Sequence, residues 1–355
     1  MLYCYPVTAT VDNWLHNCLC EILRSIHANL RADDSPLEWP GIIPIEYRER
    51  LRSRTGLKDR LMKYREVLVT LTPHNQDRVL LALDNQNRIP ELLTCQCDCD
   101  ALYDLPEPIR EPSKDLFKFA FILLTEIGIR DVHYDIIYRA VPYPVCPFCG
   151  CECFDAPSAP RHDLDHYMAK DYYPFAAANL RNLVPIGDRC NSSYKRGQDI
   201  LKRKDGSRRR SFDPYGDAAI TISLDNSEPF AGVNGRIPRW TIEFNQNIEE
   251  VDTWDEVFHI RERYERDVLD QSFDSWLRAF SAWCRSHITT PPSSNRDVID
   301  TLKRYSEYLS ELGVRDKYFL NAAVFRMLYR HCESGNERLI MFIKDLMPGV
   351  NNKGA

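Results

Sequence analysis

The feature that most constrains this chain is a series of short polar motifs between residues 146 and 196. In chain order they are Cys146-Pro-Phe-Cys149, Asp165-His166, Asn182-Leu183, Cys190-Asn191 and Lys195. The series combines a general base, oxygen ligands for a hard metal ion and a cation that can bind phosphate. Hydrolysis of a phosphodiester with one metal ion needs these groups, and few other chemistries use all of them.

The spacing of these residues suggests a role for each. Asp165 and His166 are adjacent on a predicted short strand, so their side chains point to opposite faces. One side chain can therefore bind a metal ion while the other faces the attacking water. Asn191 opens a helix predicted over residues 189–200, where its carboxamide oxygen can complete the metal site. Such oxygen ligands suit Mg²⁺ or Mn²⁺. His166 is then the expected general base, because a histidine pKa lies close to neutrality.

Each of these residues also has an ordinary structural explanation. Asp165 can occupy a turn, His166 can lie at the surface, and Asn191 can cap a helix. Their occurrence together, in this order and beside a basic segment, favours the metal site. His162 precedes the motif on the same expected strand face as His166, and we expect it to be structural or to contact substrate.

The motifs resemble those of the HNH, or ββα-metal, nuclease family. The closest resemblance is to HNH nucleases of bacterial anti-phage defence systems of the Septu and retron type. The matching elements are a CxxC pair, LDHYxxK from Leu164, NLVP from Asn182 and CNSxxK from Cys190. The resemblance implies the same roles for Asp165, His166 and Asn191, and makes Asn182 a brace for the loop that carries the histidine. It also implies a partner, an ATPase or sensor protein of the same defence system.

The cysteines of the motif region allow two explanations, a structural zinc site or buried free thiols. Members of the family often stabilise the core with two CxxC pairs that bind a structural Zn²⁺, but Gly187 stands here where one cysteine would fall. Cys151 or Cys153 can complete a four-thiolate site at unusual spacing. Alternatively the site is lost and its thiols are buried as small apolar side chains. The thiols in question are Cys146, Cys149 and Cys190.

The charge of the chain is unevenly distributed. The formal net charge is −6, yet residues 189–210 contain nine Lys or Arg against two acidic residues, a local net charge of +7. Such a patch beside a catalytic motif is the footprint expected for contacts with a phosphate backbone. A solvated loop is the alternative explanation. The residues expected to contact nucleic acid are Lys195, Arg196, Lys202, Arg203, Lys204, Arg208, Arg209 and Arg210.

The pattern outside the motif is mainly helical. We expect an α+β fold in which a ββα-metal HNH core lies among mainly α-helical flanking segments. The expected parts are a helical N-terminal domain (1–140), the HNH core (141–217), and a small β segment followed by a helical C-terminal domain (218–355). Two stretches are expected to be loop-rich: 36–54, with its repeated Pro, and 72–107, with many Pro, Asn and Asp residues.

Composition and cysteine usage limit the cellular setting. The chain is 44% apolar and 28% charged, as soluble globular proteins are. It contains no apolar run of membrane-spanning length and begins without a signal-peptide pattern, so we expect a cytoplasmic protein that does not contact membranes. Its 13 cysteines, an odd number, favour free thiols or metal ligands over a disulfide framework.

These observations predict a divalent-metal-dependent endonuclease that hydrolyses DNA and acts with a partner protein. One alternative is a catalytically silent subunit that binds nucleic acid or serves as a scaffold. Another is an RNase or nickase with the same site, because the metal and base act on the phosphate rather than on the sugar. The intact set of Asp165, His166 and Asn191 favours an enzyme, since a binding module needs no general base.

Overall fold

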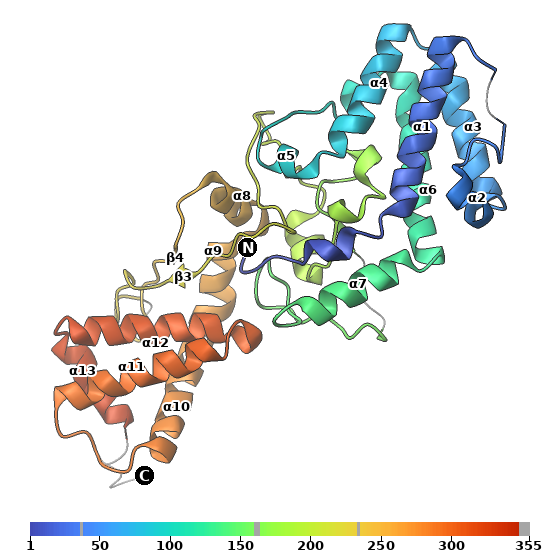
Figure 1. Ribbon diagram of the computed structural model, residues 1–355. Coiled ribbons are helices and arrows are strands. Elements are labelled where there is room, and N and C mark those ends of the chain that lie inside the picture. Colours follow the sequence, from blue (N-terminus) through green and yellow to red (C-terminus); the bar gives the residue numbers. More distant parts are fainter. Residues whose placement is uncertain (36–37, 160–163, 233–234, 348–355) are drawn as a thin grey trace. The chain divides into compact units, whose positions relative to one another are not determined.

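The computed structural model describes residues 1–35, 38–159, 164–232 and 235–347 (Figure 1). These residues divide into two compact units, one formed by residues 1, 3–146 and 153–218, the other by residue 2, residues 147–152 and residues from 219 onward. Helices dominate both, and two small antiparallel sheets accompany them. None of the helices in the described ranges has the length and apolar composition needed to span a bilayer.

The first unit begins with a helical region. Its α-helices are α1 (Trp14–Ala32), α2 (Ile45–Leu51), α3 (Thr55–Val69), α4 (Pro73–Gln86), α5 (Ile89–Leu93), α6 (Glu107–Glu126) and α7 (Ile129–Ala140), with 3-10 turns η1 (Val7–Thr10) and η2 (Leu102–Asp104). Helices α2, α4 and α5 lie where loops were expected, so that expectation was wrong. The prolines there stand at helix starts: Pro44 caps α2, and Pro73 and Pro90 lie in the first turns of α4 and α5.

The motif region packs on these helices as part of the same unit. The hydrophobic core runs from Leu23 of α1 and Phe117 of α6 to Phe175 and Leu183 of the motif region. The rings of Phe117 and Phe175 meet edge to face with centroids 5.4 Å apart. The helical region and most of the motif region thus belong to one compact unit, and residues from 219 onward belong to the other.

Two short strands and a helix carry the motif. Strand β1 (Asp165–His166) pairs antiparallel with β2 (Leu183–Val184), so that Asp165 lies opposite Val184 and His166 opposite Leu183. Two 3-10 turns, η3 (Pro174–Ala176) and η4 (Leu180–Asn182), connect the strands. The helix that follows, η5 (Arg189–Lys195), has π-type hydrogen bonding and is shorter than the expected 189–200. It ends at Lys195 because Arg196 adopts a positive φ of 50°.

The second unit contains a two-stranded sheet and a helical region. Strands β3 (Ile222–Ser223) and β4 (Glu243–Phe244) pair antiparallel, with Ile222 opposite Phe244, within the part of the chain where a small β segment was expected. The helices of the second unit are α8 (Glu249–Phe258), α9 (Ile260–Arg263), η7 (Tyr264–Leu269), α10 (Asp270–His287), α11 (Asn295–Glu311), η8 (Arg315–Lys317), α12 (Tyr318–Glu333) and α13 (Glu337–Leu346). The long apolar stripe of residues 257–280 is divided among the first four of them, because His259 adopts a left-handed conformation between α8 and α9.

Candidate active site

The predicted catalytic residues line one pocket of the first unit. Asp165 and His166 reach it from β1, Asn191 and Lys195 from η5, and Phe121 from α6. The pocket has a volume of about 260 Å³. Residues distant in the chain are thus brought together around one hollow, which is the first requirement for a catalytic site.

The protonation state of His166 is defined by its surroundings. The side chain is buried, and its Nε2 lies 3.0 Å from the carbonyl oxygen of Ala177. A carbonyl oxygen can only accept a hydrogen bond, so Nε2 carries the proton and Nδ1 keeps a lone pair. Burial lowers the pKa of His166 to about 3, and the positive charges of Lys170 and Lys195 act in the same direction. The imidazole is therefore neutral at pH 7, the form that a general base requires.

Asp165 is a buried carboxylate with a cationic neighbour. Its Oδ2 lies 2.8 Å from Nζ of Lys195, but the geometry falls short of a directional hydrogen bond, and Oδ2 accepts none within the described residues. Burial raises the pKa of Asp165, while the charge of Lys195 opposes that rise. The ammonium of Lys195 thus holds one oxygen of the carboxylate, and Asp165 also lines the pocket.

Asn191 supplies a neutral oxygen to the same pocket. Its backbone is fully used, since its N–H donates to Gly187 (3.0 Å) and its carbonyl accepts from Arg196 (2.7 Å). Its carboxamide makes no hydrogen bond in the described part of the chain and lines the pocket. Carboxylate and amide oxygens are ligands of the kind that Mg²⁺ and Mn²⁺ accept, so Asp165 and Asn191 are the pocket residues that could hold such an ion.

Asn182 is completely buried and holds the loop that follows His166. Its Oδ1 accepts from the backbone N–H of Met168 (2.7 Å), and its Nδ2 donates to the carbonyls of Met168 (3.0 Å) and Ala176 (3.2 Å). Its backbone carbonyl also accepts from the N–H of Tyr167 (2.9 Å). One side chain thus satisfies three backbone groups of the loop, which is what a bracing role requires.

Lys195 does not lie on the surface with the other basic residues. Only 1% of its side chain is exposed, and its Nζ donates to the carbonyl of His166 (2.8 Å) as well as contacting Asp165. A side chain buried to this degree offers no surface to the phosphates of a bound strand. Its expected role as a phosphate contact is therefore replaced by an internal one.

The rest of the basic segment divides between internal and external roles. Arg209 is buried and donates to the carbonyl of Asp199. Arg203 donates to the carbonyl of Arg208 (3.0 Å). Two cations lie near acidic side chains of the helical region, with Lys202 4.0 Å from Asp104 and Arg208 3.5 Å from Asp98. The exposed members of the predicted set are Arg196, Lys204 and Arg210.

Two of the predicted thiol ligands lie together in the first unit. The Sγ atoms of Cys146 and Cys190 are 3.9 Å apart. The proximity of Cys146 and Cys149 is set locally, because only two residues separate them. Zn–S bonds of about 2.3 Å place the sulfurs of a tetrahedral site roughly 3.8 Å apart, so the 146–190 pair fits zinc. Cys151 and Cys153 do not join these thiols within the described residues.

The structure adds two groups that sequence reasoning missed. Phe121 packs on His166 with ring centroids 4.4 Å apart, and the carbonyl of Ala177 fixes the tautomer of that histidine. Phe121 belongs to an apolar helix and Ala177 acts through its backbone, so neither has a local sequence signal. His162 lies outside the described residues.

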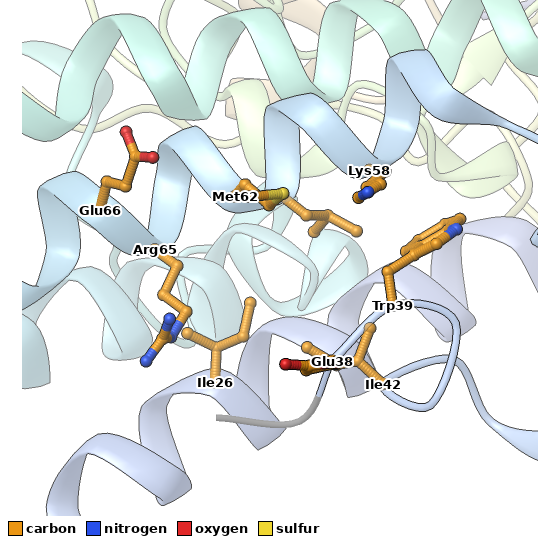
Figure 2. Close-up of a pocket in the computed structure, with 9 residues that line it drawn as sticks. Ile26, Glu38, Trp39, Ile42, Lys58, Met62, Arg65 and Glu66 are labelled. Carbon is orange, nitrogen blue, oxygen red and sulfur yellow. The ribbon is translucent and has the colours of Figure 1, made fainter. Parts of the chain in front are cut away.

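A second hollow of the first unit lacks comparable chemistry. Figure 2 shows it between α1, α3 and the segment around Trp39, with a volume of about 430 Å³. Apolar side chains such as Met62 share its lining with charges of both signs, among them Lys58 and Glu66. It contains no histidine or cysteine among the described residues that line it, so the motif pocket remains the candidate active site.

Comparison with family models, curated proteins and solved structures finds no match to this chain. The case for a function therefore rests on the residues and their geometry. Three observations carry it: the neutral, tautomer-defined His166, the oxygen donors of Asp165 and Asn191, and the exposed cations beyond η5.

Proposed function

We propose that the protein is a divalent-metal-dependent endonuclease of HNH type that hydrolyses phosphodiester bonds in DNA. The observation that carries this proposal is the tautomer of His166. Its Nε2 donates a hydrogen bond to the Ala177 carbonyl, so Nδ1 keeps the lone pair that a general base needs. That base shares a pocket with Asp165 and Asn191, whose oxygens suit a hard cation. A subunit that only binds nucleic acid has no use for this combination.

In the proposed reaction, Nδ1 of His166 accepts a proton from a water molecule that attacks the phosphorus. Asp165 and Asn191 would hold Mg²⁺ or Mn²⁺, which would supply positive charge to the phosphate and to the ester oxygen that leaves as its bond to phosphorus breaks. Asn182 keeps the loop after His166 in place, and the Ala177 carbonyl keeps the imidazole in one orientation. Burial keeps the imidazole neutral at pH 7, so its Nδ1 carries a lone pair rather than a proton.

Further parts of the proposal concern zinc and partners. The Cys146–Cys190 pair supports a structural Zn²⁺ at these thiolates, with Cys149 of the CxxC pair as a further ligand. The resemblance to HNH nucleases of anti-phage systems supports a cytoplasmic defence effector that acts with an ATPase or sensor protein. DNA is the proposed substrate, contacted through the exposed cations after η5.

Incubation of the purified protein with supercoiled plasmid, single-stranded DNA and RNA tests the proposal. Each substrate is treated with Mg²⁺, with Mn²⁺ and with EDTA. We expect plasmid cleavage with either metal and none with EDTA. Accumulation of open circles alone identifies a nickase, and cleavage confined to RNA identifies an RNase. Binding of DNA without cleavage under all metal conditions contradicts the proposal and favours a silent binding subunit.

A further inference from the structure

The buried ammonium of Lys195 connects the two elements that carry the candidate catalytic residues. Lys195 is the last residue of η5, the helix that bears Asn191, and its Nζ reaches back to β1. There it lies 2.8 Å from Oδ2 of Asp165 and donates to the carbonyl of His166 at 2.8 Å. A single side chain thus touches both residues of the strand dipeptide.

A fully buried ammonium is costly unless charge and hydrogen bonding compensate it. The compensation here comes from the Asp165 carboxylate and a backbone carbonyl, both located at the candidate site. A leucine or methionine would fill the same space without that cost. The cation is therefore better explained by what it does to Asp165 and His166 than by packing.

The contact with Lys195 also gives the two sides of the Asp165 carboxylate different surroundings. Oδ2 of Asp165 has essentially no exposed surface and faces the ammonium, whereas the residue as a whole is 9% exposed and lines the pocket. The exposed remainder therefore belongs to other atoms of Asp165. Holding one oxygen in this way fixes the rotation of the carboxyl group, and hence the direction its remaining lone pairs face.

We propose that Lys195 is a positioning residue that orients the Asp165 carboxylate and the His166 backbone relative to Asn191, so that a divalent cation finds its oxygen ligands already in place. This inference rests on the proposed nuclease function. Partners that orient metal ligands typically change metal affinity about 10-fold to 100-fold when they are removed.

Lys170 provides a matched control. It lines the same pocket and its charge also lowers the pKa of His166, yet within the described residues it makes no ion pair with Asp165. If Lys195 contributed only positive charge, replacing either lysine by methionine would remove repulsion and strengthen binding of a divalent cation. A positioning role predicts opposite signs, with weaker binding in Lys195→Met and equal or stronger binding in Lys170→Met.

The test measures Mn²⁺ affinity by calorimetry on zinc-loaded wild type, Lys195→Met and Lys170→Met, with Asp165→Ala defining the site. We expect Mn²⁺ binding to weaken at least about tenfold in Lys195→Met. Cleavage under saturating DNA and metal should also fall, while the KM for DNA stays near wild type. The inference is overturned if folded Lys195→Met binds Mn²⁺ as well as or better than wild type.

Loss of a buried partner can unfold a protein, so a second variant is included. Lys195→Gln keeps a hydrogen-bond donor on a side chain one bond shorter but loses the charge, and it should bind Mn²⁺ more weakly than wild type. Affinity equal to or above wild type in this variant also overturns the inference. Failure of the nuclease proposal is recognised separately, because wild type itself would then neither bind Mn²⁺ at Asp165 nor cut DNA.

Discussion

The ring of Phe121 lies against the imidazole of His166, with centroids 4.4 Å apart and planes inclined by 54°. Phe121 belongs to α6, well before the motif in the chain, so the helical region forms one wall of the candidate site. Its contact helps to exclude water from the imidazole, whose pKa burial lowers to about 3. The environment of His166 therefore depends on residues outside the motif.

Replacing His166 by alanine should abolish cleavage while DNA binding remains. Loss of general-base assistance typically costs about 10²-fold to 10⁴-fold in rate. Plasmid cleavage under saturating Mg²⁺ measures the effect, and circular dichroism confirms folding. His74→Ala, at an exposed position of α4, is the control and should cut like wild type. Equal rates for both variants would remove His166 from the mechanism.

Asp165→Ala and Asn191→Ala should act through the metal ion. Each should weaken Mg²⁺ or Mn²⁺ binding, and Asp165→Ala should do so more strongly because it removes a charge. High metal concentration should partly restore cleavage in Asn191→Ala, since water can replace one neutral ligand. Calorimetry with Mn²⁺ measures both affinities. Unchanged affinity in the two variants would show that neither side chain binds the metal.

The thiol group predicts about one zinc per chain by elemental analysis. Cys146→Ser, Cys149→Ser and Cys190→Ser should each lose zinc and melt at a lower temperature. Structural zinc contributes on the order of 10 kcal/mol to folding in small domains, so the change should be large. Cys95→Ser, at an exposed thiol, is the control. Zinc-free wild type with an unchanged melting temperature would instead favour thiols that only pack.

The exposed cations after η5 should set the salt dependence of DNA binding. Combined replacement of Arg196, Lys204 and Arg210 by glutamine should weaken binding for all sequences alike. It should also flatten the plot of log affinity against log salt, by about 0.9 for each phosphate that the variant no longer neutralises. Cleavage at saturating DNA should persist. A binding curve that overlays wild type at every salt concentration would show that the segment is a solvated loop.

The control for the salt-dependence experiment removes the same number of positive charges from the helical region of the first unit. It replaces three exposed cations by glutamine: Arg52, Lys63 and Lys118. We expect its salt dependence to match wild type, because these cations lie outside the basic segment. A similar weakening in both triple variants would indicate a general effect of net charge instead of a localised interaction.

Stability should fall in mild acid because of a buried histidine in α1. His27 is buried with Nε2 3.1 Å from the hydroxyl of Tyr64, and burial lowers the pKa of His27 to about 4. Between about pH 6.5 and pH 4 the unfolded chain binds a proton that the folded chain excludes, so the free energy of unfolding decreases as the pH falls. One such group contributes a slope of up to about 1.4 kcal/mol per pH unit.

Urea unfolding in EDTA at several pH values measures that slope. His27→Gln cannot be protonated and keeps a hydrogen-bonding group, so its stability should depend less on pH than that of wild type. His74→Gln, at an exposed position, should retain the wild-type slope. Identical slopes for wild type and His27→Gln would show that this imidazole does not contribute.

The sequence predicts some elements well, because their patterns are local. The alternation around Ile222 and Phe244 predicts the strand pair that the structure contains. The prolines at 44, 73 and 90 suggested loops, yet each stands at a helix start, where the missing N–H costs nothing. His259 interrupts the long apolar stripe with a left-handed conformation, and because the residue is not a glycine the sequence does not indicate this break.

The candidate site, too, could be predicted from the sequence only in part. Asp165, His166 and Asn191 could be proposed because their order along the chain resembles a known motif. Lys195 was assigned to the surface because it lies in a basic segment, and only the three-dimensional structure shows its ammonium enclosed beside Asp165. The contributions of Phe121 and Ala177 depend on packing and on a backbone carbonyl, which composition and spacing do not encode.

The core shared by the helices and the motif region bears on how genetic screens of this protein should be interpreted. Phe117 packs on Phe175, and Leu164 and Leu183 lie in the same apolar cluster as Leu23. Inactivating substitutions in α1 or α6 will therefore appear among loss-of-function alleles although they are far from the motif in the chain. Such alleles should not be taken to mark a partner-binding surface unless the encoded protein is shown to be folded.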